Sequence, residues 1–236
     1  MTLEFSPDRS PGFYGLVGPN AAGKTHYLRS LFGPGAALVP AAADALFVGR
    51  TVRDHLAWAA EAKPLDEISL GFPESSRLST LSVGQRRELT FAVALAANEP
   101  LLLLDEPFDG LDIDTRTRLR ARLIDFIAAD PGRTVVMASH RAEDLAGLAE
   151  HVIRVSEREV ADPVALDEAR TRFPVLRGEA GDRKQVLAGL DVLDVSTLGP
   201  AWRAQLAQPL DRALPGTTLD YPDDAQLIDL LASRKA

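Results

Sequence analysis

Near the start of the chain, one short stretch combines two glycines with a lysine and a threonine. It reads Gly18-Pro19-Asn20-Ala21-Ala22-Gly23-Lys24-Thr25 and fits the spacing G-x-x-x-x-G-K-[ST] at every fixed position. Glycines allow a turn so tight that consecutive backbone N–H groups converge on phosphate oxygens, and a following helix start adds positive charge. Lys24 can neutralise the β- and γ-phosphates, and the Thr25 hydroxyl suits Mg²⁺. This phosphate loop predicts a site for a nucleoside triphosphate with Mg²⁺.

A second acidic stretch, "LLLLDEP", follows about 80 residues later, from Leu101 to Pro107. Four leucines before a proline stop predict a strand buried on both faces. Such a strand would place the Asp105 carboxylate near Thr25, where it can hold Mg²⁺ directly or through water. Glu106, the next residue, can activate a water aimed at the γ-phosphate as a general base.

The elements that position these residues follow from hydrophobic periodicity. Apolar runs predict strands and amphipathic stretches predict helices, with Thr51, Ser82 and Asp112 or Asp114 as helix N-caps. The predicted strands are residues 12–17, 45–49, 101–105, 133–139 and 151–155, and the predicted helices are 24–32, 52–63, 83–99, 112–130 and 141–150. This alternation predicts an α/β fold, a parallel sheet covered by helices.

The pattern also suggests how the chain is divided. Residues of about 51–98 hold two predicted helices and no strand, which predicts a helical subdomain. After residue 160 the pattern weakens into short pieces separated by prolines. We therefore expect a main domain over residues 1–160 and a small α/β C-terminal appendage over residues 161–236.

The composition excludes several classes of protein. The 236 residues include no cysteine, which removes disulfides and thiolate sites and fits a reducing cytosol. The sequence has neither an apolar run long enough for a bilayer nor a secretory signal pattern, so any pore would be another polypeptide. A net charge of −8 argues against nucleic acid as a partner.

Five segments together resemble the nucleotide-binding subunits of ABC transporters. The phosphate loop resembles the family's Walker A segment, and "LLLLDEP" resembles Walker B with its glutamate. Three shorter matches are "LSVGQ" (81–85), like the family signature LSGGQ, "DGLD" (109–112), like the D-loop, and Ser139-His140, like the switch histidine. The resemblance implies a P-loop NTPase core that binds ATP and Mg²⁺. A phosphate loop alone would name only a P-loop NTPase, so the signature before Walker B makes the match specific.

The resemblance also implies roles for single residues. Ser82, Gly84 and Gln85 would meet the γ-phosphate held by a second subunit, so that two chains clasp two ATP molecules. His140 would contact the γ-phosphate and position the attacking water beside Glu106. Two positions keep an alternative. Asp112 would help the two nucleotide sites communicate, as the resemblance implies, or it could simply cap a helix. His26 could donate to the α-phosphate or be a surface residue, and we favour the surface.

Two features depart from the family pattern. The family's glutamine between Walker A and the helical subdomain is absent, because Gln85 is the first glutamine of the chain. Ala41 or Ala42 stands there, and Asp44 is a candidate replacement. The family's adenine-stacking aromatic lies well upstream of Walker A, and only 17 residues precede Gly18, which leaves Phe5 as the candidate.

These observations favour the ATP-hydrolysing subunit of a transporter. It would work as a dimer, expected to be a homodimer, bound to an integral-membrane permease at the cytoplasmic face of the membrane. The layout most resembles subunits of small-molecule or drug exporters. An alternative is an ABC-like subunit that binds nucleotide but hydrolyses little and regulates a partner. A P-loop kinase is disfavoured, since it would have no use for the signature.

Overall fold

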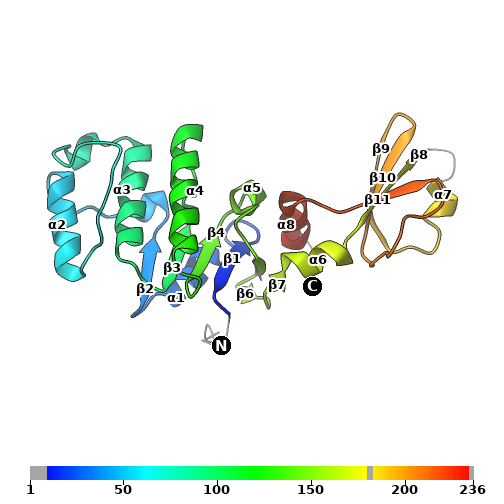
Figure 1. Cartoon of the computed structure of the whole chain (residues 1–236), viewed down its shortest axis with the longest axis horizontal. Coiled ribbons are helices and arrows are strands. Elements are labelled where there is room, and N and C mark those ends of the chain that lie inside the picture. Colours follow the sequence, from blue (N-terminus) through cyan, green and yellow to red (C-terminus); the bar gives the residue numbers. More distant parts are fainter. Residues whose placement is uncertain (1–9, 180–182, 234–236) are drawn as a thin grey trace.

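A β-sheet with helices on both faces forms the larger part of the computed structural model, which describes residues 10–179 and 183–233 (Figure 1). Its strands run in the order β2-β3-β4-β1-β5-β6, and β7 pairs with β5. Neighbours from β2 to β5 are parallel, whereas β6 and β7 are antiparallel to β5. The strands are β1 (Gly12–Val17), β2 (Ala36–Val39), β3 (Leu101–Asp105), β4 (Thr134–Ala138), β5 (His151–Ser156), β6 (Glu159–Val160) and β7 (Val164–Ala165). The expected parallel core is thus confirmed.

Both faces of this sheet are buried, because alternate residues of each strand face different helices. In β3, Leu102 and Leu104 join the hydrophobic cluster on the side of α3 (Val83–Ala96) and α4 (Ile113–Ala128). Leu103 joins the opposite cluster, on the side of α1 (Lys24–Ser30). All three leucines are fully buried, as the leucine run predicted.

Helix starts follow the predicted N-caps. Thr51 begins α2 (Val52–Ala62) with a capping box, in which its hydroxyl accepts the Asp54 N–H while the Asp54 carboxylate accepts the Thr51 N–H. Ser82 does the same at α3 with Gln85. The Asp112 carboxylate accepts the Thr115 N–H at 2.8 Å and begins α4. In the stretch predicted as a helical subdomain, α2, the start of α3 and a 3₁₀ turn at Leu78–Thr80 lie around a small core of Val52, Leu78, Leu81 and Leu89.

Two sequence predictions were wrong in detail. Residues 45–49 form no strand, and Leu46 is 86% exposed, so this apolar residue is not part of the core. The strand lies earlier, at Ala36–Val39, where β2 pairs with β3. The helix expected over 141–150 is the single turn α5 (Ala142–Leu145), which ends before Gly147 with its φ of 69°.

The chain after residue 160 forms a second sheet and also contributes helices to the first. A second sheet, in the order β11-β8-β10-β9, surrounds its own small core of Leu176, Trp202, Ala204 and Leu206 (Figure 1). The helix α6, before the second sheet, and the helix α8, after it, pack on the first sheet. Phe173, which follows α6, and Leu227 of α8 belong to the main core. The elements are α6 (Leu166–Arg172), β8 (Val175–Glu179), α7 (Arg183–Val186), β9 (Val192–Leu198), β10 (Ala201–Leu206), β11 (Thr217–Asp220) and α8 (Asp224–Ser233). A domain boundary at residue 160 stays a prediction. Both α6 and α8, which follow that residue, pack against the first sheet.

Within residues 10–179 and 183–233, no helix combines the length and the apolar character that crossing a membrane would need.

Candidate phosphate-binding site

The loop after β1 curls back on itself in a way that only its small residues permit. Gly18 has a φ of 142°, and a Cβ there would lie 2.0 Å from the Val155 carbonyl oxygen. Ala21 and Gly23 also have positive φ values, 62° and 109°. The Ala22 N–H donates to the Pro19 carbonyl at 3.2 Å and closes the curl. Gly23 is the N-cap of α1, so the loop runs directly into a helix start, as predicted.

Lys24 lies inside this loop rather than in solvent. It is 8% exposed, and its Nζ donates to the Gly18 carbonyl at 2.8 Å and to the Pro19 carbonyl at 3.0 Å. Burial lowers the pKa of the Lys24 ammonium, and the carboxylates of Glu106 and Asp105 act in the opposite direction. A partly desolvated cation beside converging N–H groups is suited to bind an oxyanion.

Asp105 and Thr25 meet where β3 ends. Asp105 is 3% exposed, and burial raises the pKa of its carboxyl, while a hydrogen bond from Thr25 acts against that shift. No group of three acidic or histidine ligands occurs among the described residues. Two oxygen donors nevertheless fit Mg²⁺, which commonly takes one or two protein ligands and fills its shell with phosphates and water.

Glu106 and His140 come together although 34 residues separate them. Asp105 is in register with Ala138 across β3 and β4, so the residues that follow both strands leave the sheet at the same edge. His140 Nδ1 lies 2.9 Å from Glu106 Oε2, and the His140 N–H donates to the same oxygen at 3.3 Å. Glu106 adopts a φ of 47°, a costly conformation for a non-glycine residue and typical of functional sites.

Buried beneath this pair, Arg87 of α3 supports the backbone of Glu106. Its Nη2 donates to the Glu106 carbonyl at 2.7 Å, and its Nη1 donates to the Pro40 carbonyl at 2.5 Å. The guanidinium is 3% exposed, and burial lowers the pKa of Arg87 despite three nearby carboxylates. Sequence reasoning missed Arg87, because an arginine on a helix is usually a surface residue.

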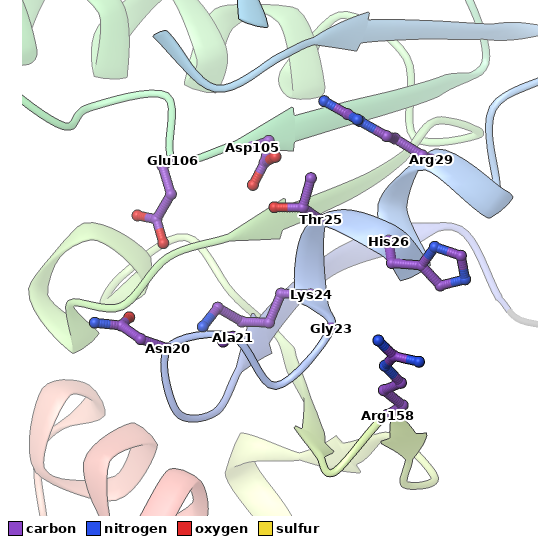
Figure 2. Close-up of a pocket in the computed structure, with 10 residues that line it drawn as sticks. All are labelled: Asn20, Ala21, Gly23, Lys24, Thr25, His26, Arg29, Asp105, Glu106 and Arg158. Atoms are coloured by element: carbon purple, nitrogen blue, oxygen red, sulfur yellow. The ribbon is translucent and has the colours of Figure 1, made fainter. Parts of the chain in front are cut away.

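A cavity of about 520 Å³ opens over the loop (Figure 2). Most of the predicted phosphate-loop residues line it, together with Asp105 and Glu106. Ala22 is buried beneath, and Gly18 and Pro19 line a neighbouring cavity. Arg29 and Arg158 also line the cavity over the loop, and the sequence did not predict them. Among the described residues, the lining is Asn20, Ala21, Gly23, Lys24, Thr25, His26, Arg29, Asp105, Glu106 and Arg158.

The signature residues do not belong to this cavity. Ser82 and Gln85 hold each other in the capping box of α3, with the Ser82 N–H donating to Gln85 Oε1 at 3.0 Å. Gly84 packs beside Asp112 and Thr115 at the start of α4. Within one chain, the structure therefore brings together Walker A, Walker B and the histidine, but not the signature.

Asp44, the candidate for the missing glutamine, is held by another partner. Its carboxylate lies 2.5 Å from Arg29 Nη2, in a pair about half exposed to solvent. The 3₁₀ turn Ala42–Asp44 forms this corner of the site, and the charge of Asp44 contributes to the raised pKa of the Asp105 carboxyl. The ion pair with Arg29 engages the Asp44 carboxylate at the rim of the cavity.

Comparisons with known proteins show which family the sequence resembles. The sequence pattern that describes the ABC transporter family matches residues 36–109. The aliphatic sulfonates import ATP-binding protein SsuB 2 of Pseudomonas savastanoi pv. phaseolicola is 30% identical over 80% of this chain and 79% of that protein. SsuB 1 of Pseudomonas syringae pv. tomato is 30% identical over 84% and 78%, respectively.

A solved structure described as the ATP binding subunit of an ABC transporter has a similar fold. It superposes with a TM-score of 0.58 at 22% identity, over 67% of this chain and 80% of that one. With the phosphate loop, the buried aspartate and the glutamate–histidine pair at one sheet edge, these likenesses identify the chain as a member of the ABC transporter ATP-binding protein family.

Proposed function

We propose that this chain hydrolyses ATP between two facing subunits and thereby drives a separate membrane permease. The observation that carries the proposal is the contact of Glu106 with His140 beside the phosphate loop. A carboxylate fixed by a histidine is suited to orient and deprotonate a water. An ABC-like subunit that only binds nucleotide would not need this pair.

The triphosphate would lie along the loop. The backbone N–H groups of residues 20–25 and the Lys24 ammonium would bind its β- and γ-phosphates, and His26 would lie beside the α-phosphate, towards the nucleoside end. Thr25 and Asp105 would hold Mg²⁺, which would neutralise phosphate charge. Glu106 would take a proton from the attacking water while His140 keeps the carboxylate oriented. Positioning and charge neutralisation supply most of the acceleration in such reactions.

A second subunit would complete the site. Ser82, Gly84 and Gln85 lie outside the cavity of their own chain, so a phosphate can meet them only across an interface or after a large movement. Exposed apolar residues support an interface here: Val83 is 57% exposed, and Ile113, at the start of the neighbouring helix, is 83% exposed. Two identical chains related by a twofold axis would satisfy both sites at once.

The permease would contact the helical subdomain at the cytoplasmic face of the membrane. Leu46 and Trp58, which are 86% and 48% exposed, lie on or beside α2, and such residues mark interaction surfaces when they gather. Trp58 stacks on His55, which in turn contacts Phe47 edge-on. The proposal names no cargo: the expected likeness to drug exporters finds no support in the two relatives above, which are named for sulfonate import.

The variant Glu106→Gln tests hydrolysis and dimerisation together. It should bind ATP-Mg with unchanged affinity, release phosphate at least 100-fold more slowly, and accumulate as a dimer in ATP but not in ADP. Light scattering and phosphate release measure both effects. A variant that stays monomeric in saturating ATP-Mg and hydrolyses at the wild-type rate would show that the proposed roles are wrong.

A further inference from the structure

We propose that the Arg158 guanidinium is the surface on which the purine base of the nucleotide stacks, with the His26 imidazole beside it. The proposal rests on the proposed function, because it assigns the nucleoside end of the same site. It gives to Arg158 the base-stacking role for which Phe5, outside the described residues, was the candidate in the sequence.

The cavity has two chemically different ends. Figure 2 shows Glu106 and Asn20 on one side of the phosphate loop, and His26 and Arg158 on the other. A triphosphate whose terminal phosphate faces Glu106 must therefore extend its nucleoside towards His26 and Arg158.

A tight turn fixes Arg158 in this place. Ser156 pairs with Glu159 across β5 and β6, so the hairpin turns in only two residues, Glu157 and Arg158. Both have left-handed backbones, with φ values of 52° and 67°, as a type I′ turn requires. The Arg158 N–H donates to the Ala22 carbonyl at 3.0 Å, which attaches the turn to the phosphate loop. An arginine at a position that favours glycine or asparagine is costly, and it places a side chain over the loop.

The side chain has the right chemistry and is available. Its stem packs close to Gly23, where the Arg158 Cγ would lie 3.5 Å from an added Cβ. Arg158 is exposed, and no ion pair or side-chain hydrogen bond involves it within the described part of the chain. Among the described residues, no phenylalanine, tyrosine or tryptophan lines the cavity. Arg29, the other guanidinium in the lining, is paired with Asp44, which leaves Arg158 and His26 as the flat groups at the nucleoside end. A guanidinium plane stacks well on aromatic rings, and its charge adds a cation–π attraction.

The experiment compares ATP with inorganic tripolyphosphate, each with Mg²⁺, by calorimetric titration of the purified full chain. Tripolyphosphate carries the three phosphates but no base. Arg158→Ala should weaken ATP binding roughly 2- to 5-fold and leave tripolyphosphate binding unchanged. Arg158→Lys, which keeps the charge but not the plane, should lose a similar factor. Glu157→Ala alters the same turn outside the cavity and should behave as wild type.

Three results would overturn the proposal. Equal losses for ATP and tripolyphosphate would mean that Arg158 binds phosphate, and full affinity in Arg158→Lys would mean that charge alone matters. Unchanged ATP binding in Arg158→Ala, with the loss appearing in Phe5→Ala instead, would assign the stacking to Phe5, which lies outside the described residues. Arg158→Gly, which the left-handed backbone accommodates, repeats the deletion should the alanine variant misfold. Lys24→Ala reports on the proposed function separately: if that variant kept its affinity for both ligands, the phosphate site itself would be wrong.

Discussion

His140 Nδ1 lies 2.9 Å from Glu106 Oε2, at the edge of the sheet where β3 and β4 end. The same carboxylate oxygen also receives the His140 N–H. Since this peptide group belongs to the turn after β4, the carboxylate is tied to the neighbouring strand as well as to the imidazole. The direction in which Glu106 points is therefore fixed by the register of two parallel strands.

Lys24→Ala should abolish most nucleotide affinity without unfolding the chain. Charged hydrogen bonds contribute about 1.5–3 kcal/mol each, so we expect roughly 10- to 100-fold weaker binding of ATP-Mg. Titration of a fluorescent nucleotide measures the change. Lys63→Ala is the matched control, because Lys63 lies in the helical subdomain and pairs with Glu99. Equal affinity in the two variants would contradict the role assigned to the phosphate loop.

Arg87→Met should affect both stability and turnover. Methionine keeps much of the volume but leaves the carbonyls of Pro40 and Glu106 without their donor, which should lower the free energy of unfolding by roughly 2–3 kcal/mol. Because the Glu106 backbone then loses its support, kcat should fall more than KM rises. Denaturant unfolding and steady-state hydrolysis measure the two effects.

Arg53→Met is the control for Arg87, since the Arg53 side chain is 73% exposed and makes a surface pair. If Arg87→Met lost stability while its kcat stayed at the wild-type value, Arg87 would be a structural residue only.

Gly18→Ala should be among the most damaging single substitutions. A Cβ at this position would lie 2.0 Å from the backbone oxygen of Val155, which has no freedom to move away within β5. The clash and the positive φ together should cost about 2–4 kcal/mol. Gly33→Ala provides the comparison, because nothing lies within 4 Å of a Cβ there. Thermal unfolding of both proteins should show a large shift for Gly18→Ala alone; similar midpoints would refute the steric argument.

His55 should make the helical subdomain sensitive to acid. Its Nδ1 accepts the Val48 N–H at 3.2 Å, and burial lowers the pKa of the imidazole. A proton therefore binds the unfolded chain first, so stability is lost as pH falls through about 6.5, the ordinary value for histidine. His55→Asn can keep an acceptor without titrating. Denaturant unfolding from pH 8 to pH 5 should show a shallower decline for that variant, and parallel curves would exclude His55 as the cause.

Local signals predicted the parts of this molecule in which one short segment carries both structure and chemistry. The phosphate loop, the leucine strand and the capped starts of α2, α3 and α4 lie where the sequence placed them. Strand β2 escaped prediction because Ala36–Val39 has only four residues, two of them alanines with weak strand preference. The more apolar Leu46 segment attracted the prediction instead.

The arginines of the site escaped prediction for a different reason. Arg87 becomes buried only when α3 crosses the ends of β2 and β3, and Arg158 reaches the cavity only because β5 pairs beside β1. Neither has a local pattern: the turn at Glu157 and Arg158 contains no glycine or asparagine to announce it. The role of Arg158 can therefore be inferred only from the tertiary structure.

The return of α8 to the first sheet has a practical consequence for dissecting the chain. Leu227 and Ile228 are buried in the main core, although the polypeptide leaves that core at Phe173 and travels through the second sheet before coming back. A protein truncated at residue 160 would expose the apolar surface of β5 and α5 that α8 covers, and we expect it to aggregate. Deleting the second sheet alone, by joining the end of α6 to the start of α8, would keep this apolar surface buried.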